Sequence, residues 1–146
     1  MSGIAAWAIL GLATTVVAGC EAPAPQACED RLTDTVAHVV DGDTLDGESY
    51  GRIRLALVDT PETGEAGSDE AAAFTQSLCP AGSRMAVDVD DGQPWDTTGT
   101  RRVAKVTCSG SNLNAALLEA GHAVILRSFC AVSEFAGEDW ARADCR

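Results

Sequence analysis

The stretch of residues 39–63 constrains the fold more than any other part of the chain. Its acidic residues gather at two turns, 41–44 (Asp-Gly-Asp-Thr) and 59–62 (Asp-Thr-Pro-Glu). Between the turns, residues 52–58 alternate in polarity, which predicts a strand with Arg54 on the face opposite to the apolar side chains. The apolar face comprises Ile53, Leu55 and Leu57. The two turns meet only if the first closes a hairpin, for which Gly42, Gly47 and Gly51 supply the flexible points.

The rest of the chain supplies the elements of one domain, because 146 residues are enough for a single core. Apolar periodicity predicts further strands at 33–40, 44–45, 84–90 and 102–108, an extended segment at 123–126, and helices at 68–78, 112–121 and 133–143. This order predicts an α+β, mainly β fold: a five-stranded OB-fold barrel with about three helices over residues 33–146. A ferredoxin-like sandwich needs a helix after its first strand, and none is visible there.

The N-terminal segment predicts export. Residues 4–18 are apolar and uncharged but too short to span a bilayer comfortably, so residues 1–19 are expected to form a signal peptide. Residues 17–20 (Val-Ala-Gly-Cys) resemble the lipobox of bacterial lipoproteins, which implies a lipidated Cys20 followed by a linker, 20–32. Acyl chains would then anchor the protein to a membrane. The alternative is an ordinary secretory signal with Cys20 unmodified.

Five cysteines remain after Cys20, and an exported protein is expected to use them in disulfides. They are Cys28, Cys79, Cys108, Cys130 and Cys145. Because five is odd, one thiol is left over; the expected pairs include Cys130–Cys145, with Cys28 as a competitor for Cys145. No Cys-x-x-Cys motif is present, and His38 and His122 do not complete a zinc site, so both histidines are expected to be structural.

The formal charge of −12 argues against tight, non-specific binding to long nucleic-acid duplexes, since such binding depends on neutralising phosphates. It does not argue against a site that recruits a cation first. Lys105 is expected to be a solvated strand residue, and Trp95 either stacks a base or anchors its loop. The acids Asp88, Asp90 and Asp91 are expected to form a solvated edge rather than a cation site.

Four segments together resemble the thermonuclease (staphylococcal nuclease-like) family. They are residues 41–44 (Asp-Gly-Asp-Thr), 54–62 (Arg-Leu-Ala-Leu-Val-Asp-Thr-Pro-Glu), 101–104 (Arg-Arg-Val-Ala) and 113–123 (Leu-Asn-Ala-Ala-Leu-Leu-Glu-Ala-Gly-His-Ala). The likeness extends from about residue 33 to residue 129. It implies an OB-fold, Ca²⁺ binding and hydrolysis of phosphodiester bonds in DNA and RNA.

The resemblance also implies roles for individual residues. Asp43 and Asp59 would be carboxylate ligands of calcium, and Thr60 would add its backbone carbonyl. Calcium prefers such hard oxygen ligands, and it polarises a phosphoryl oxygen. Arg54 would hold the scissile phosphate, with Arg101 as a second clamp, because the planar guanidinium bonds two oxygens at once. Two further positions complete the set: Glu62 as the general base for water, and Asp41 behind the metal.

The sequence also departs from the family pattern. The loop after Glu62 is short, and no aromatic residue stands in segment 96–100 (Asp-Thr-Thr-Gly-Thr). One extra residue there leaves Arg102 as an alternative clamp, while Phe129 stands where a tyrosine is expected and could stack weakly on a base. The same mapping implies a disulfide between Cys79 and Cys108.

Two functions remain open from the sequence alone. The first is a secreted or membrane-anchored, calcium-dependent nuclease acting on DNA, RNA or both, with no obligate protein partner. The second is an OB-fold binding or structural lipoprotein domain with weak catalysis or none. The conjunction of acids and arginines favours the first, and the acidic charge with the missing tyrosines favours the second.

Overall fold

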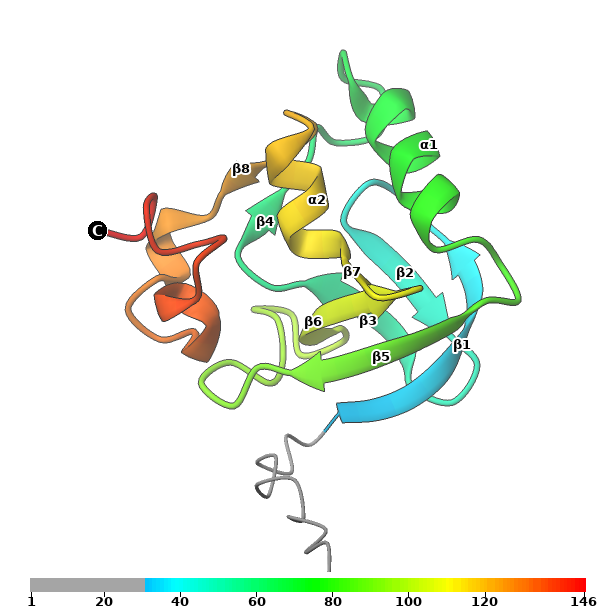
Figure 1. The fold of residues 1–146 in the computed structure, drawn as a ribbon, viewed down its shortest axis with the longest axis horizontal. Coiled ribbons are helices and arrows are strands. Elements are labelled where there is room, and N and C mark those ends of the chain that lie inside the picture. Colours follow the sequence, from blue (N-terminus) through cyan, green and yellow to red (C-terminus); the bar gives the residue numbers. More distant parts are fainter. Residues whose placement is uncertain (1–30) are drawn as a thin grey trace, which may run out of the picture.

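The structure is a computed structural model, and it describes residues 31–146 (Figure 1). The expected signal peptide, Cys20 and Cys28 lie outside these residues. The strands are β1 (Arg31–Val39), β2 (Thr44–Gly47), β3 (Gly51–Leu55), β4 (Val58–Asp59), β5 (Arg84–Val89), β6 (Arg102–Cys108), β7 (Ser111–Asn112) and β8 (Val124–Ile125). The helices are α1 (Ser68–Leu78) and α2 (Leu113–Glu119), followed by the 3-10 turns η1 (Arg127–Phe129) and η2 (Glu134–Gly137). The expected linker ends within β1, which already includes residues 31 and 32.

Strands β1, β2, β3, β5 and β6 form the predicted closed barrel. The sheet order is β3-β2-β1-β5-β6-β7, and a parallel pairing of β3 with β6 closes it, with Ile53 opposite Arg102 and Leu55 opposite Ala104. The short strands β4 and β8 pair separately beside it. The barrel interior is filled mainly by aliphatic side chains: Val36, Leu45, Ile53, Leu55, Met85, Val87, Ala104 and Val106. The fold is therefore the expected OB-type barrel with helices packed against it (Figure 1).

Helix α1 supports the first acidic turn. It begins after Gly67, whose positive φ of 91° suits glycine, and its first turn carries acids that complement the helix dipole. Ala71 and Thr75 are its fully buried core-facing residues, and the Thr75 hydroxyl donates to the Gly42 carbonyl at 2.6 Å. Phe74 packs against the same core from a half-buried position. The helix thus fixes the turn that carries Asp43.

Helix α2 is tied to the barrel through one buried amide. The Asn112 side chain caps its N-terminus by accepting from the N–H of Ala115. Asn114, fully buried, accepts from the N–H of Val106 at 3.0 Å and donates to the carbonyl of Ala56 at 2.9 Å. These bonds satisfy backbone groups where β3 and β6 separate.

The predicted last helix, 133–143, is largely absent, and only the short turn η2 forms there. Glu138 adopts an extended conformation, which ends η2. Its carboxylate accepts from Lys105 Nζ at 2.5 Å, and Asp88 accepts from the same atom at 3.1 Å. Lys105 is therefore buried and doubly paired, and the expectation of a solvated lysine is wrong.

The expectation of a solvated acidic edge is also wrong for Asp90, which is fully buried. Asp90 Oδ1 accepts from the N–H groups of Gly92 at 3.0 Å and Glu134 at 3.2 Å, so it joins the end of β5 to the C-terminal segment. Its role in the described structure is to anchor backbone.

The structure contains both expected disulfides. Cys79–Cys108 links the end of α1 to the end of β6, with both residues buried. Cys130–Cys145 closes the C-terminal segment over a second apolar cluster that includes Leu57, Val103 and Phe135. Within residues 31–146 no helix combines the length and hydropathy needed to cross a membrane.

Candidate active site

Asp43 is the most buried acid of the first turn, with 5% of its surface exposed. Its Oδ2 accepts from the N–H of Thr60 at 2.8 Å and from the Thr60 hydroxyl at 2.9 Å. Burial raises the pKa of Asp43 above its ordinary value, although the Arg54 charge opposes this. Gly42 is required beside it, because a Cβ there would lie 2.7 Å from both Ala71 Cβ and Thr60 Oγ1. The two acidic turns therefore meet as predicted.

Arg54 joins the two turns electrostatically. Its Nη1 lies 2.8 Å from Asp43 Oδ2, and its Nη2 lies 2.8 Å from Asp59 Oδ1. Nη1 also donates to the Val58 carbonyl at 2.8 Å. The guanidinium is mostly buried, while 41% of the Asp59 side chain is exposed. One positive charge thus sits between two carboxylates from different turns.

The strand predicted over residues 52–58 is shorter in the structure, because the chain reverses direction at Leu57. Strand β3 ends at Leu55, and Leu57 has a φ of 62°, an uncommon conformation for a non-glycine residue. Leu57 therefore packs in the second apolar cluster instead of the barrel interior with Ile53 and Leu55. The reversal at Leu57 turns Val58 and Asp59 back toward Arg54, a placement that alternation along one strand does not predict.

A cavity of about 170 Å³ lies beside Arg54. Among its lining residues are Arg54, Asp59, Arg101 and Phe129. The structure thus brings two guanidinium groups to one cavity and places Phe129 in its wall. Arg102 is not among the lining residues; its Cζ lies 4.5 Å from the centroid of the Trp95 ring.

Asp96 holds Arg101 in place, and sequence reasoning missed it. Its Oδ2 accepts from Arg101 Nε at 2.8 Å, and its Oδ1 accepts from the N–H of Thr100 at 3.1 Å. Burial tends to raise the pKa of Asp96, but the bonds from Arg101 and the loop amides outweigh it and hold the pKa far below the usual range. The available signal was the pattern Asp96-Thr-Thr-Gly, which is typical of an Asp-stabilised turn.

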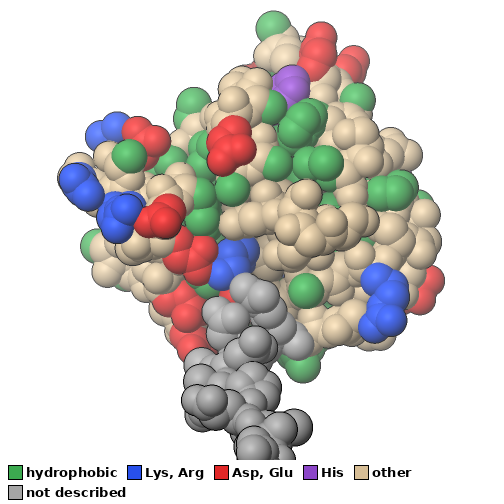
Figure 2. Space-filling view, viewed as in Figure 1, with side chains coloured by type: hydrophobic (Ala, Val, Ile, Leu, Met, Phe, Trp, Pro, Cys, Tyr) green, Lys and Arg blue, Asp and Glu red, His purple; other side chains and the backbone are tan. Residues whose placement is uncertain are grey.

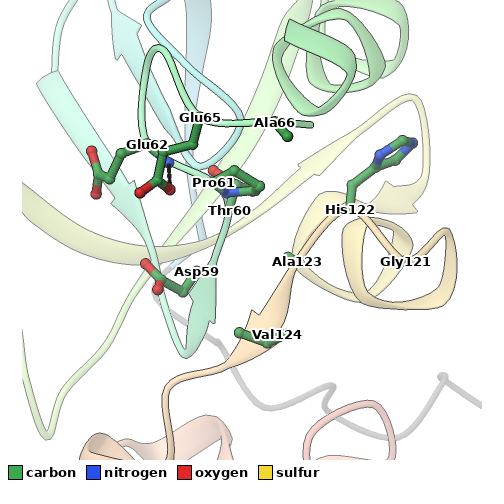
Figure 3. A pocket seen from close by; sticks show the side chains of 10 residues that line it. All are labelled: Asp59, Thr60, Pro61, Glu62, Glu65, Ala66, Gly121, His122, Ala123 and Val124. Carbon is green, nitrogen blue, oxygen red and sulfur yellow. Dashed lines mark hydrogen bonds between the residues drawn. The ribbon is translucent and has the colours of Figure 1, made fainter. Parts of the chain in front are cut away.

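Glu62 lies on the other side of Asp59, at a larger open groove of about 520 Å³. Asp59 lines both the groove and the cavity. Glu62 is exposed, and its N–H donates to Glu65 Oε2 at 3.0 Å, as Figure 3 shows. His122 contributes to the opposite wall, and its ring centroid lies 4.8 Å from that of Phe74, which agrees with a structural histidine. Asp41 is half-buried and accepts from the N–H of Asp43 at 3.1 Å.

The oxygen donors at Arg54 suit a hard cation in their chemistry. Asp43 and Asp59 each direct one oxygen at the same guanidinium, so the two carboxylates converge. Within residues 31–146, no three carboxylate, imidazole or thiolate groups gather closely enough to ligate a metal by themselves. Calcium accepts backbone, water and substrate oxygens as further ligands, so two carboxylates are a compatible core.

The charges on the protein surface form no continuous basic area in the view of Figure 2. Basic side chains stand there in small separate groups, most of them with acidic side chains beside them. A long polyanion therefore finds no extended basic track on this face.

Comparison with known proteins identifies the family of the chain. The family profile described as Staphylococcal nuclease homologue matches residues 52–139, more than half of the chain. An uncharacterized protein of Bacillus anthracis is similar as well, with 31% identity over 109 residues that cover 68% of this chain and 50% of that protein. The chain thus spans about half the length of the curated relative that it matches. The matched segment contains Arg54, Asp59 and Arg101, and the chain belongs to the staphylococcal nuclease homologue family.

Proposed function

We propose that this protein is an exported, calcium-dependent nuclease that hydrolyses phosphodiester bonds of DNA, RNA or both. The observation that carries the proposal is the shared cavity, where Arg54 and Arg101 line one space with Asp59 at its edge. A single phosphate between two guanidinium groups receives the bidentate bonds that Arg forms with phosphate oxygens. Family membership supports the same reaction class.

Asp43, Asp59 and the backbone carbonyl of Thr60 are the proposed calcium ligands, with Asp41 ordering water behind them. The bound cation would polarise a phosphoryl oxygen and orient water. Asp43 is held for this task by the Thr60 N–H and hydroxyl, so its orientation is determined before any ligand binds. Such preorganised charge needs no rearrangement during the reaction.

Arg54 and Arg101 bind the scissile phosphate in the proposed mechanism and stabilise the added negative charge on its oxygens. Glu62 takes a proton from the attacking water, and its exposure leaves it accessible to that water. Asp96 fixes Arg101 through Nε, which leaves the terminal nitrogens of that guanidinium for phosphate oxygens. Phe129 forms part of the wall on which a base could rest.

The proposed location is outside the cytoplasm, on a membrane through a lipidated Cys20 or otherwise secreted. Disulfides persist in oxidising compartments, and Cys79–Cys108 and Cys130–Cys145 agree with export. Mass spectrometry of the mature N-terminus tests the anchor. Acylated Cys20 is the expected result, and cleavage at another site or an unmodified Cys20 excludes lipidation.

The activity test measures cleavage of single- and double-stranded DNA and of RNA, first with calcium and then with a chelator. We expect cleavage that depends on calcium and that Glu62→Gln or Arg54→Ala nearly abolishes, while circular dichroism shows a folded chain. Wild-type rates in either variant contradict the roles assigned here. Binding of nucleic acid without any cleavage would instead identify a catalytically inactive OB-fold binding module.

A further inference from the structure

The hairpin that carries Arg101 presents a second pair of side chains on its other face. Its two arms are joined by bonds from the N–H of Asp96 to the Arg101 carbonyl at 2.9 Å and from the N–H of Val103 to the Pro94 carbonyl. Trp95 stands opposite Arg102 in this pairing. Because side chains alternate along extended arms, the Asp96–Arg101 pair faces the cavity and the Trp95–Arg102 pair faces away from it.

Arg102 lies between two aromatic rings. Its Cζ is 4.5 Å from the centroid of Trp95 and 5.6 Å from that of Tyr50, distances at which a guanidinium and an aromatic ring attract each other. Tyr50 is held by Asp34, which accepts from its N–H at 2.9 Å. Trp95 nevertheless keeps 45% of its surface exposed. Tyr50 is therefore fixed to the barrel through its backbone, while the Trp95 side of this cluster is open to solvent.

Arg102 also differs from most cations of the described chain in its charge environment. Arg52, Arg101 and Lys105 each pair with a carboxylate. No carboxylate within residues 31–146 lies at ion-pair distance from Arg102. On an acidic protein, this leaves a positive charge beside an exposed aromatic face, the combination with which proteins bind single-stranded nucleic acid.

We propose that Trp95 and Arg102 form a subsite for one unpaired nucleotide of a single-stranded substrate. The base stacks on the exposed indole and the adjoining phosphate pairs with Arg102. This inference rests on the proposed nuclease function and specifies its substrate. Unpaired bases are required because a base inside a duplex has no free face for the indole.

The proposed subsite contributes only to the binding of substrates that extend beyond the nucleotide at the cleavage point. Asp96 and Thr97 of the same hairpin line the phosphate cavity, so a strand that crosses this hairpin on leaving the cavity would come to Trp95 on the other face. Short substrates end before that point. The subsite therefore contributes to the binding of oligonucleotides and not to the binding of a single nucleotide diester.

The kinetic test compares Trp95→Ala, Trp95→Phe and wild type on two substrates, an oligothymidylate of about eight nucleotides, within the usual OB-fold site size, and thymidine 5′-(4-nitrophenyl phosphate). We expect Trp95→Ala to raise the ratio of the oligonucleotide KM to the small-diester KM by roughly ten- to a hundredfold. Trp95→Phe should restore most of the ratio, since it keeps an aromatic face. An unchanged ratio overturns the subsite, and if both KM values rise equally the substitution has damaged the cavity instead.

The matched control is Val132→Ala, which removes another exposed apolar side chain, 51% exposed and outside the hairpin, and should leave the ratio unchanged. Thermal unfolding of all variants checks that each chain is folded.

A binding experiment separates failure of the subsite from failure of the nuclease assignment. Fluorescence anisotropy of a labelled oligothymidylate is measured with Glu62→Gln, alone and combined with Trp95→Ala. Binding that depends on Trp95 without any wild-type cleavage would retain the subsite and reject the nuclease. Cleavage that depends on Glu62 with binding indifferent to Trp95 would reject only the subsite. Equal competition by a duplex of the same length would overturn the preference for single strands.

Discussion

The two sides of Asp59 are built in opposite ways. On the cavity side, Arg54 is mostly buried and bonded to Asp43, Asp59 and the Val58 carbonyl. On the groove side, Glu62 is exposed, and its backbone N–H and carbonyl both form hydrogen bonds with the neighbouring Glu65 of the same loop. The charges expected to hold a cation and a phosphate are thus positioned by folding, whereas the proposed base sits on a loop with few contacts.

This contrast has a physical reason. Preorganised charges are effective because they need no rearrangement when negative charge develops on the substrate. Burying them costs solvation, so each needs partners in the free protein. A carboxylate that must reach water does not need burial, and a loop of low local stability can carry it. Variants on the cavity side should therefore change stability as well as rate, and variants on the groove side should change rate alone.

The largest expected effect is a loss of rate without a loss of stability, and it belongs to a variant on the groove side. Glu62→Gln should lower the turnover number by roughly a hundred- to ten-thousandfold, the range for loss of a general base. Its free energy of unfolding should stay within about 0.5 kcal/mol of wild type, as for other exposed substitutions. Urea denaturation and initial-rate kinetics measure both quantities. A large loss of stability would break the proposed contrast.

Arg54→Ala should lower the rate by roughly a hundred- to a thousandfold and should also destabilise the fold. Removing the guanidinium leaves Asp43 buried without its counter-charge, which costs about 3 kcal/mol. Arg54→Lys keeps the charge and should recover part of the stability but little of the rate, because an ammonium does not form the planar fork. If both variants unfold at the wild-type urea midpoint, the buried pair is not a stabilising element.

Asp96→Asn should have a smaller effect, lowering the rate about tenfold through misplacement of Arg101. It also changes the pH dependence of stability. The pKa of Asp96 lies below the unfolded value, so its contribution is present above about pH 4. That contribution is lost as the pH falls through the lower folded pKa. Thermal melts of Asp96→Asn should consequently decline less steeply below pH 4 than those of wild type, and parallel curves would argue against the pairing.

The smallest expected effect on activity comes from a residue outside the site, Lys105, whose contribution to stability changes at alkaline pH. Burial opposes the charge of Lys105, but Glu138 and Asp88 outweigh it and raise the pKa of the ammonium. The stabilising contribution is therefore complete below the ordinary lysine pKa, about 10.4, and is lost as the pH rises through the higher folded value. Lys105→Met should remove this alkaline step in melting temperature while cleavage near neutral pH is retained. A change in activity as large as that of Asp96→Asn would link the C-terminal segment to the site.

Local patterns in the sequence were sufficient for the barrel strands and for the contact between the two acidic turns. Alternation located the strands, and the two acidic turns with Arg54 between them identified the residues that meet. The prediction of a last helix was wrong although residues 133–143 have a helical pattern. Glu138 is extended there and pairs with Lys105, a contact between segments far apart in the sequence. Lys105 was mispredicted for the same reason, since its carboxylate partners lie on β5 and after η2.

What the sequence determined by itself is the set of elements and the chemistry of the two turns, because periodicity and residue type act over a few neighbouring positions. Only the tertiary structure decided which arginine faces the cavity, that Asp96 holds it, and that Leu57 reverses the chain toward Arg54. Those outcomes depend on the pairing of β3 with β6 and on the packing of a hairpin against the barrel. The β3–β6 pairing joins residues tens of positions apart, which no local pattern records, and the Asp96 turn pattern by itself does not say which arginine faces the cavity.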